Sequence, residues 1–535
     1  MGTIVRSLAV NDADAIVIGA GLNGSWVAKE LTCGGMKVAL IDAGPILQNS
    51  MFAIDRLQAD VFNPRYHLFR LTLLLRGETD RAINKFITRQ TQKLFLDRRR
   101  DPYITPFGRE FTWNRVRAVG GRGHLWGRVM LRMTDRQLSA PGFEWPLEYE
   151  DLAPYYTEVE RMLEMGGAPS LASGVPDGEY VHERSLHPLE RQFCDAVLRR
   201  RPLRCAVVNH VAQYEPSPLS PMLRVALATG RLQLFPNKTV AILTASGAAN
   251  LITGVTTVDT MSGAVESFQA PYVVLAASAF ESVRILLNSR SEKFPNGVGN
   301  GNGLLGTRIL EHMMVNISAQ LPASMRAKNP TYRHNPFKLN AEPHGFYLPP
   351  FSHLEDRGTP YRFDYGVQGT ISTDTGLFYL GAFGETVPSD ANRLRLDATR
   401  KDRSGVPVAS VDFSWGAEDL AMGKDAHRAL AEMVETFCRD SGIKLKNPLT
   451  GRVYNMLAMN GPPVPGSNHE CGGARMGRDP ATSIVDPYNR IWEAPNVLVC
   501  DAACFPSIPH QNPALTTMAL AIRAGRQLLA SRSSS

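Results

Sequence analysis

Long hydrophobic runs are absent from the 535 residues of the chain. No uninterrupted apolar stretch approaches the roughly 18 residues that a membrane-spanning helix needs. Residues 1–14 are polar, and the apolar residues after them have the pattern of a buried strand. We therefore expect neither a membrane span nor a cleavable signal peptide.

Cysteine is scarce: the seven cysteines are odd in number and scattered along the chain. No pair of CxxC motifs occurs, which argues against a structural zinc site and against a disulfide framework. A cytoplasmic location, in a reducing compartment, fits this usage best. We expect no metal site.

Charged residues make up 20% and hydrophobic residues 44% of the chain, which is typical of a globular protein. The length predicts roughly two to four domains. The net charge is +7, and basic runs at 98–100 and 199–201 could contact nucleic acid or acidic lipid. Because no nucleic-acid-binding motif accompanies them, we expect a solvated surface and no nucleic-acid partner.

A dinucleotide-binding turn lies near the N-terminus. Residues 15–18 predict a buried parallel strand, followed by Gly19, Ala20, Gly21, Leu22, Asn23 and Gly24. The three glycines permit a tight turn, backbone approach to a pyrophosphate, and close packing of a helix on the strand.

The elements after this turn complete the unit. A helix over 25–31 would point its N-terminus at the pyrophosphate. A second strand over 37–42 ends at Asp42, whose carboxylate can accept hydrogen bonds from ribose hydroxyls. The unit predicts FAD or NAD and does not choose between them, and a glycine-rich connector without a ligand is the alternative.

The remaining chain alternates between α/β and β-rich patterns. Residues 52–104 predict a helical or irregular insertion, and 119–127 form a second glycine-rich loop. Residues 232–277 predict a meander that ends in a buried strand, with a helix beginning near Phe280.

The C-terminal half continues this pattern. Residues 313–412 alternate like strands, 417–441 predict one amphipathic helix, and 496–530 predict a strand, a turn and a helix. Elements of α/β type at both ends and a β-rich middle predict an α/β (α+β) fold of two interleaved domains.

These motifs resemble, over nearly the whole length, the glucose-methanol-choline (GMC) flavoprotein oxidoreductases. The resemblance rests on Gly19 to Gly24 with Asp42, Gly120-Gly121, residues 274–277 before Glu281-Ser282, Gly384-Glu385 to Asn392, Asp501-Ala502 and Asn512-Pro513. Within the family the chain is most similar to the pyranose 2-oxidase and glycoside 3-oxidase (3-dehydrogenase) branch. The features of that branch are Glu144-Trp145-Pro146, residues 152–156, and a histidine–asparagine pair. Cholesterol oxidases are similar in their Asn-Pro segment.

The resemblance implies FAD rather than NAD, and a Rossmann-like FAD-binding domain interleaved with a sheet-containing substrate domain. We expect the FAD-binding domain to comprise 1–50, 105–130, 230–312 and 466–535, with an insertion at 51–104 and a substrate domain from 131–229 and 313–465. The expected cofactor-binding residues are Gly19, Gly21, Leu22, Asn23, Gly24, Asp42, Ala43, Gly120, Gly121, His124, Leu125, Trp126, Ala277, Asp501, Ala502, Asn512 and Pro513.

One position departs from the family pattern. Pyranose oxidases attach FAD covalently through a histidine just before the tryptophan of the second glycine loop. Here that position is Leu125, and His124 lies one residue earlier. We therefore expect non-covalent FAD.

His469 falls at the catalytic histidine of the family and Asn512 at the second member of its pair. An unperturbed imidazole titrates near pH 6.5, so a neutral His469 can accept a hydroxyl proton while the carbinol hydride moves to the flavin. Asn512 precedes Pro513 and a helical pattern, so it could also cap a helix. His510 is the alternative second member of the pair.

We expect an FAD-dependent enzyme that oxidises a secondary ring hydroxyl, at C2 or C3, of a pyranose or glycoside to a keto-sugar. The electron acceptor could be oxygen, a quinone or a redox protein, and a homo-oligomer is an open expectation. The alternatives are an oxidase of a sterol, an aliphatic alcohol or a primary hydroxyl, and a hydroxynitrile-lyase-like member without net redox chemistry.

Overall fold

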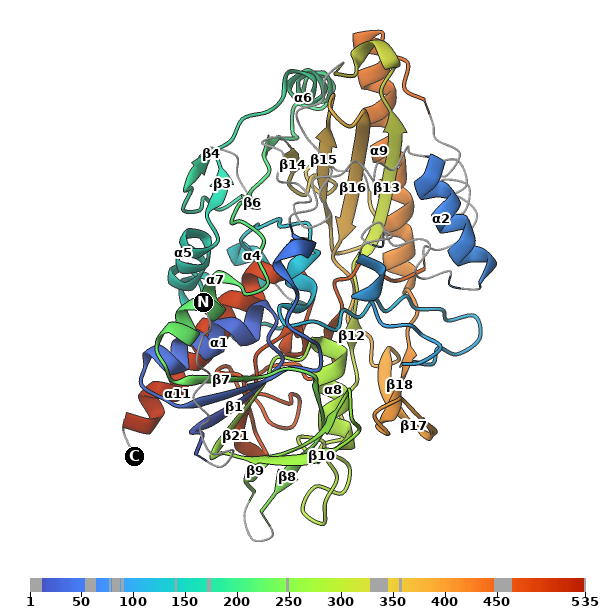
Figure 1. Cartoon of the computed structure of the whole chain (residues 1–535). Coiled ribbons are helices and arrows are strands. Elements are labelled where there is room, and N and C mark those ends of the chain that lie inside the picture. The colour runs from blue at the N-terminus through green and yellow to red at the C-terminus, as the bar shows by residue number, and fades with distance from the viewer. Residues whose placement is uncertain are drawn as a thin grey trace.

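The computed structural model describes residues 12–52, 64–76, 78, 87, 91–139, 142–170, 175–246, 250–327, 345–355, 358–446 and 464–533. Residues 1–11, on which the expectation about a signal peptide partly rests, lie outside these ranges. So do parts of the predicted insertion and of the predicted substrate-domain segment 313–465. The described chain is built around two large sheets, one at each end of the molecule in Figure 1.

The lower sheet in Figure 1 has six strands in the order β20-β21-β11-β1-β2-β7. Five of them run parallel, and β20 pairs antiparallel with β21. Its strands are β1 (Ala15–Ile18), β2 (Val38–Ile41), β7 (Leu232–Phe235), β11 (Tyr272–Leu275), β20 (Arg490–Ile491) and β21 (Ala494–Val499). The predicted buried strands at 15–18, 37–42 and 272–277 are confirmed, because β1 and β2 are buried throughout and β11 over most of its length.

Helices cover this sheet. The helix after the glycine turn begins three residues earlier than expected, because Gly21 is its N-cap and Gly24 already lies in its first turn. It packs against the C-terminal helix, which also contacts α5. These helices are α1 (Leu22–Cys33), α5 (Ala153–Met162), α7 (Pro221–Ala228) and α11 (Ala514–Ser533).

The predicted meander forms a small antiparallel sheet beside the parallel one. It consists of β8 (Lys238–Ala245), β9 (Ile252–Asp259) and β10 (Val265–Gln269). The helix α8 (Ala279–Asn288) follows β11, begins next to the predicted Phe280, and packs on β8.

The upper sheet in Figure 1 has five antiparallel strands in the order β13-β16-β15-β14-β5. Burial alternates along β13, so that one side of the sheet packs on the long helix α9 and joins an apolar core. The helix predicted over 417–441 coincides with α9. The elements are β5 (Val207–Val208), β13 (Met313–Gln320), β14 (Phe346–Leu348), β15 (Tyr365–Ile371), β16 (Leu377–Gly384), α6 (Pro188–Arg200) and α9 (Ala417–Ser441).

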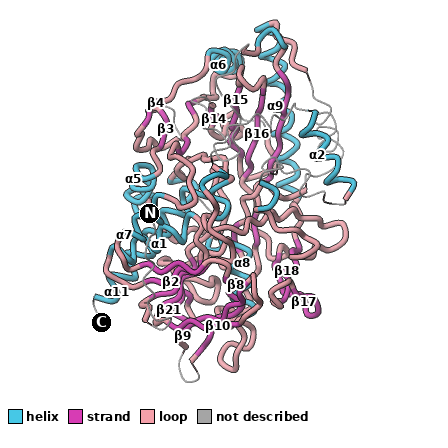
Figure 2. Tube along the Cα trace, in the orientation of Figure 1, coloured by secondary structure: helices cyan, strands magenta, loops and turns pink. Residues whose placement is uncertain are grey.

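Short elements and loops connect the two sheets (Figure 2). The short strands are β3 (Met165–Gly167), β4 (His182–Glu183), β6 (Val211–Ala212), β12 (Ile309–Leu310) and β19 (Cys471–Gly472), and the longer β17 (Arg393–Lys401) and β18 (Pro407–Asp412) pair as a separate antiparallel ribbon. Within the described ranges, the remaining α-helices are α2 (Pro64–Leu75), in the predicted insertion, and α4 (Asp135–Ser139). The β12–β19 pair matters most for function, because Leu310 lies opposite Cys471 and brings the residues next to them together.

All seven cysteines are free. Among the described residues, no group of His, Cys, Asp or Glu side chains is arranged to hold a metal ion. In the same part of the chain, every helix is too short or too polar to cross a membrane.

Candidate active site

Two glycine loops face each other at the carboxyl end of β1. A Cβ on Gly19 (φ +96°) would lie 2.4 Å from the Ala276 carbonyl oxygen, and one on Gly24 would lie 1.8 Å from the carbonyl oxygen of Gly19. A Cβ on Gly21 would meet nothing within 4 Å, and one on Gly121 would meet only the Cα of Gly21, at 3.7 Å. Gly19 and Gly24 therefore hold the turn, while the backbone at Gly21 is open to the approach of a ligand such as a pyrophosphate.

Asp42 follows β2 directly and is tied to the same turn. Its Oδ2 accepts the N–H of Ala20 and its Oδ1 the N–H of Gly44, both at 2.8 Å. Burial raises the pKa of Asp42 to about 6. Each carboxylate oxygen has a second lone pair, so a ribose hydroxyl can still donate to it.

Other expected cofactor residues stand next to these. Leu22 and Asn23 lie in the first turn of α1, where backbone N–H groups have no partner within the helix. Ala43 continues the chain from Asp42 toward Gly44 and is partly buried.

The second glycine loop is fixed by its own histidine. His124 Nε2–H donates to the Val119 carbonyl oxygen at 2.7 Å, and burial lowers the pKa of His124. Gly120 has φ +95°, and a Cβ there would lie 2.2 Å from His124 Nε2. Leu125 packs in an apolar cluster with residues of the insertion, and Trp126 is partly buried against the main core. His124 is thus engaged in holding the loop.

Asp501 links the carboxyl ends of β11 and β21. It accepts the Ser282 hydroxyl at 2.5 Å and the N–H of Ala503 at 3.0 Å, and Ser282 Oγ accepts the N–H of Ala277 at 3.2 Å. Ala502 begins the short 3₁₀ helix that Asp501 caps. Burial raises the pKa of Asp501 to about 6. In open α/β sheets, this edge is where ligands bind.

The structure brings His469 and Asn512 together. Asn512 Nδ2 lies 3.2 Å from His469 Nε2, and both side chains are only partly buried. The Asn512 Oδ1 accepts a hydrogen bond of 2.6 Å from Gln368 Nε2. Both ends of the Asn512 amide are therefore engaged outside the helix. The predicted capping role is not seen, because α11 begins only at Ala514 and Pro513 precedes it.

A second histidine lies behind His469. His312 Nδ1 is 2.7 Å from His469 Nδ1, and His312 Nε2 is 2.6 Å from the Pro509 carbonyl oxygen. The two imidazole rings are nearly perpendicular, with centroids 4.8 Å apart. Burial lowers the pKa of His312 to about 4, so its ring is neutral near pH 7.

These contacts assign the protons. A carbonyl oxygen can only accept, so His312 Nε2 carries the hydrogen and its Nδ1 has a free lone pair. The hydrogen between the rings must then sit on His469 Nδ1. When His469 is neutral, its Nε2 is the basic nitrogen, and it faces the amide of Asn512.

Two buried carboxyl groups lie beside this pair. Glu311 Oε1 accepts hydrogen bonds from the backbone N–H groups of His312 and His469, at 2.9 and 3.2 Å. It also accepts one from the Ser467 hydroxyl. Glu470 is 2.5 Å from Arg122, a residue of the second glycine loop. Burial, followed by the neighbouring Glu470, raises the pKa of Glu311 to about 8. Glu311 is therefore neutral near pH 7, while Glu470 pairs with a cation.

His510, the alternative partner, has different neighbours. Its Nδ1 lies 2.9 Å from Glu385 Oε1 and 2.7 Å from Gln137 Nε2. Although burial opposes it, the hydrogen bond from His510 lowers the pKa of Glu385. His510 thus belongs to a buried network and is not hydrogen-bonded to His469 through its Nδ1.

The side of the upper sheet that faces away from α9 borders His469 and His312. Phe383 on β16 lies 5.8 Å from the rings of both His469 and His312. Tyr347 stands opposite Gln368 in the register, so both side chains share that side. Gly366, also on this side, has no room for a side chain because a Cβ would lie within 2.9 Å of Tyr347 and His510.

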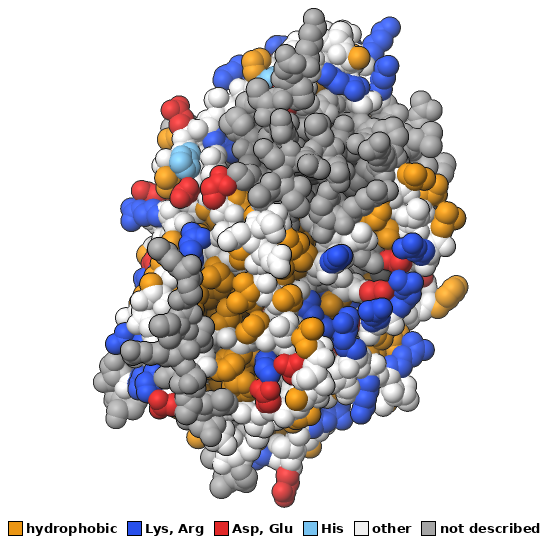
Figure 3. Space-filling view, viewed as in Figure 1, with side chains coloured by type: hydrophobic (Ala, Val, Ile, Leu, Met, Phe, Trp, Pro, Cys, Tyr) orange, Lys and Arg blue, Asp and Glu red, His pale blue; other side chains and the backbone are white. Residues whose placement is uncertain are grey.

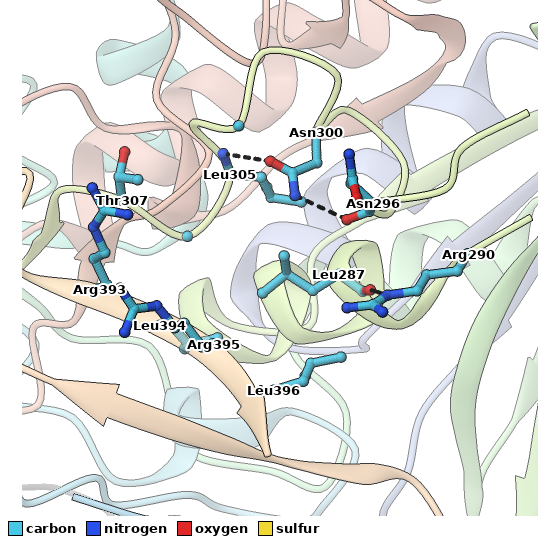
Figure 4. A pocket seen from close by; sticks show the side chains of 12 residues that line it. Leu287, Arg290, Asn296, Asn300, Leu305, Thr307, Arg393, Leu394, Arg395 and Leu396 are labelled. Atoms are coloured by element: carbon cyan, nitrogen blue, oxygen red, sulfur yellow. Dashed lines mark hydrogen bonds between the residues drawn. The ribbon is translucent and has the colours of Figure 1, made fainter. Parts of the chain in front are cut away.

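A surface pocket of about 340 Å³ lies away from these residues (Figure 4). It is lined by parts of α8, the 296–307 loop and β17, and shares no residue with the histidine pair. Arg290 and Arg393 on its wall each donate through Nε to a backbone carbonyl oxygen, of Leu287 and Asp390 respectively. The pocket therefore plays no part in the candidate site.

Sequence reasoning missed three contributors to the site: His312, Gln368 and Phe383. In the sequence, nothing in the spacing of Glu311-His312 from His469 indicated contact. The β12–β19 pairing creates that contact. Gln368 and Phe383 carry no motif, and only the strand register of the upper sheet places them.

Known proteins share this architecture. The structure superimposes on a formate oxidase from Aspergillus oryzae RIB40 with a TM-score of 0.68 and 14% sequence identity, covering 99% of this chain and 100% of the other. At that identity the likeness concerns the fold alone.

Sequence relatives extend over the whole chain. It is 25% identical to 2-methyl-1,2-propanediol dehydrogenase of Mycolicibacterium austroafricanum, over 97% of this chain and 95% of the relative. It is 26% identical to paromamine 6'-oxidase of Streptomyces fradiae, over 96% and 90%. A shorter match, of 28% of this chain and 26% of the relative, is 29% identical to C-glycoside 3-oxidase of Microbacterium trichothecenolyticum.

Residues 388–521 match the family model described as GMC oxidoreductase. This segment contains both His469 and Asn512. The family match, the similarity to relatives along the whole chain and the shared fold agree with one another. The chain is thus similar to GMC oxidoreductases along its length, and its segment 388–521 matches their family model.

Proposed function

We propose that the protein is an FAD-dependent oxidoreductase that oxidises a secondary ring hydroxyl, at C2 or C3, of a pyranose or glycoside to a keto-sugar. The observation that carries this proposal is the contact between His469 and Asn512, with the basic Nε2 of His469 turned to the amide. A base and a hydrogen-bond donor that meet at one point can hold and deprotonate a single hydroxyl group.

The glycine cradle fits FAD. Gly21 leaves room at the pyrophosphate position, and Asp42 and Asp501 are buried carboxyl groups with remaining lone pairs at the edge of the parallel sheet. When bound, FAD supplies the acceptor for the hydride of the carbinol carbon. We propose that FAD is bound without a covalent link.

The residues of the chain would perform the proton chemistry. His469 Nε2 accepts the hydroxyl proton, and Asn512 Nδ2 donates a hydrogen bond to the substrate oxygen. His312 keeps the second hydrogen of His469 on Nδ1, so the base presents the same nitrogen in each turnover. Gln368 fixes the amide orientation of Asn512.

Two features support a sugar-like substrate. The side of the upper sheet that borders the pair carries polar groups, Gln368 and Tyr347, next to the aromatic ring of Phe383. An amide, a phenol hydroxyl and an aromatic ring together are suited to the polar edges and apolar faces of a pyranose. The names of two relatives, C-glycoside 3-oxidase and paromamine 6'-oxidase, point to the same substrate class.

The experiment is anaerobic mixing of the holoenzyme with pyranoses, glycosides and simple alcohols, while the flavin absorbance is followed. We expect pyranoses or glycosides to bleach the flavin, and product analysis to find a ketone at C2 or C3. An aldehyde product would instead assign a primary hydroxyl.

The second candidate is an oxidase or dehydrogenase of small alcohols, which the similarity to 2-methyl-1,2-propanediol dehydrogenase favours. Bleaching by aliphatic diols and none by sugars would establish it. Cleavage of mandelonitrile without any bleaching would indicate a lyase.

A further inference from the structure

The helix α2 has apolar residues on two sides. Phe69 and Leu73 face inward and are buried in a cluster with Leu94 and Phe95. Four leucines remain exposed to solvent: Leu68 by 58%, Leu71 by 49%, Leu74 by 47% and Leu75 by 80%. Figure 3 shows hydrophobic side chains gathered where α2 lies in Figure 1.

Such a helix is unusual at a protein–water boundary. A surface helix normally turns a polar side to water, and a helix that is apolar all around is covered by something. Contiguous exposed apolar side chains mark interaction sites. The outer leucines of α2 therefore indicate a surface that is covered when the protein works.

Arginines surround the C-terminal end of α2. Arg76 is exposed directly after the helix, and residues 98–100 are all exposed. An ion pair of 3.2 Å between Arg99 and Glu78 fastens the run 98–100 to the end of α2. Figure 3 shows basic side chains beside the hydrophobic ones on the same face.

Two carboxylates pair with Arg99 and are more buried than the arginine itself. The side chain of Glu78 is only 5% exposed, whereas that of its partner Arg99 is 63% exposed. Asp97 is bonded to the same arginine, at 3.0 Å. These pairs balance the charge of Arg99, so the basic character of this surface comes from Arg76, Arg98 and Arg100, which are all exposed.

We propose that this α2 surface, made of Leu68, Leu71, Leu74, Leu75, Arg76 and residues 98–100, docks on an anionic lipid bilayer. Leucines that enter the interface and arginines that contact lipid phosphates are the two components of peripheral membrane binding. Charge complementarity favours an anionic bilayer over a second copy of the chain, because two copies docked by this surface would bring like-charged arginines together. Nucleic acid would leave the leucines in water.

The test is co-sedimentation of the FAD-loaded protein with phosphatidylcholine vesicles, with and without phosphatidylglycerol. We expect binding to the phosphatidylglycerol vesicles only, weakened by salt. The double variant Leu71→Asp/Leu75→Asp should lower the bound fraction at least about 10-fold, and Arg76→Ala and Arg100→Ala about fivefold each.

A matched control places the same aspartates elsewhere. Met261 and Val265, in the hairpin between β9 and β10, are exposed by 82% and 68%, and Met261→Asp/Val265→Asp should bind vesicles like the wild type. Thermal melting and the flavin spectrum would establish that every variant is folded.

Three results would overturn the proposal. The first is a wild-type protein that does not co-sediment with phosphatidylglycerol vesicles. The second is equal loss of binding in the control and the leucine variant. The third is a wild-type oligomer that light scattering shows to dissociate in Leu71→Asp/Leu75→Asp, since a second copy would then cover the leucines.

Discussion

At the scale of single residues, the candidate site depends on which nitrogen of His469 is basic. The chain of contacts from the Pro509 carbonyl through His312 to His469 makes Nε2 the basic nitrogen of a neutral His469. The identity of His469 and Asn512 as a pair could be proposed from motifs. The proton arrangement could not, because it depends on a second histidine, His312, that is distant in the sequence.

His312→Phe removes the acceptor for the Nδ1 hydrogen of His469 and retains a ring of similar size. We expect flavin reduction to slow by about 10-fold or more, with little change in KM, because the base no longer has one fixed proton arrangement. The pH profile of reduction should shift as well. His312→Asn, which can still accept a hydrogen bond, should restore part of the rate, and His182→Phe, at an exposed site, should change nothing. A pH profile identical to that of the wild type would contradict this role.

The raised pKa of Glu311 makes the stability of the fold depend on pH. Its folded-state pKa is raised to about 8, so the fold favours the protonated carboxyl group, and stability is lost as the pH rises from the ordinary carboxyl range through 8. Glu311→Gln should flatten this dependence, so that the variant melts at a higher temperature than the wild type at pH 9. Melting curves from pH 5 to 9 would measure it, with Glu183→Gln as an exposed control. An unchanged slope in Glu311→Gln would argue against a protonated Glu311.

His124 bears on the attachment of the cofactor. Because its Nε2 is engaged by the Val119 carbonyl and the residue before Trp126 is a leucine, FAD should dissociate on denaturation. After cold-acid precipitation we expect the yellow colour in the supernatant. A yellow pellet would reveal a covalent bond.

At the scale of elements, the glycines of the first turn have separate tasks. Gly24→Ala should lower the melting temperature of the apoprotein and impair FAD binding, because its Cβ would clash with the Gly19 carbonyl. Gly21→Ala meets no protein atom within 4 Å, so it should leave the apoprotein stable and weaken only FAD binding, by about 10-fold or more. Melting of apoprotein and titration with FAD would separate the two effects. Equal FAD affinity in Gly21→Ala and the wild type would show that no pyrophosphate lies there.

The regular elements were predictable where their periodicity was strong. The strands β1, β2 and β11 and the helix α9 follow from buried β-branched runs or helical spacing. The start of α1 was missed by three residues, since a glycine inside a first turn looks like part of the preceding loop. The hydrogen bonds of the Asn512 side chain could not be predicted, because they join it to Gln368 and His469, which are distant in the sequence.

At the scale of the whole molecule, the α/β fold and the similarity to GMC oxidoreductases could be predicted from the order of the motifs. The strand order of the parallel sheet and the packing of the upper sheet against α9 could not, because they depend on contacts between distant segments. The division into domains, with boundaries at 50, 104, 130, 229, 312 and 465, stays a prediction.

Stopped-flow measurement of anaerobic flavin reduction in His469→Ala, with the sugar that best bleaches the wild type, tests the central claim most directly. We predict that the variant keeps its FAD and reduces it at least about 10² times more slowly. Reduction at the wild-type rate would contradict the account and move the base away from His469.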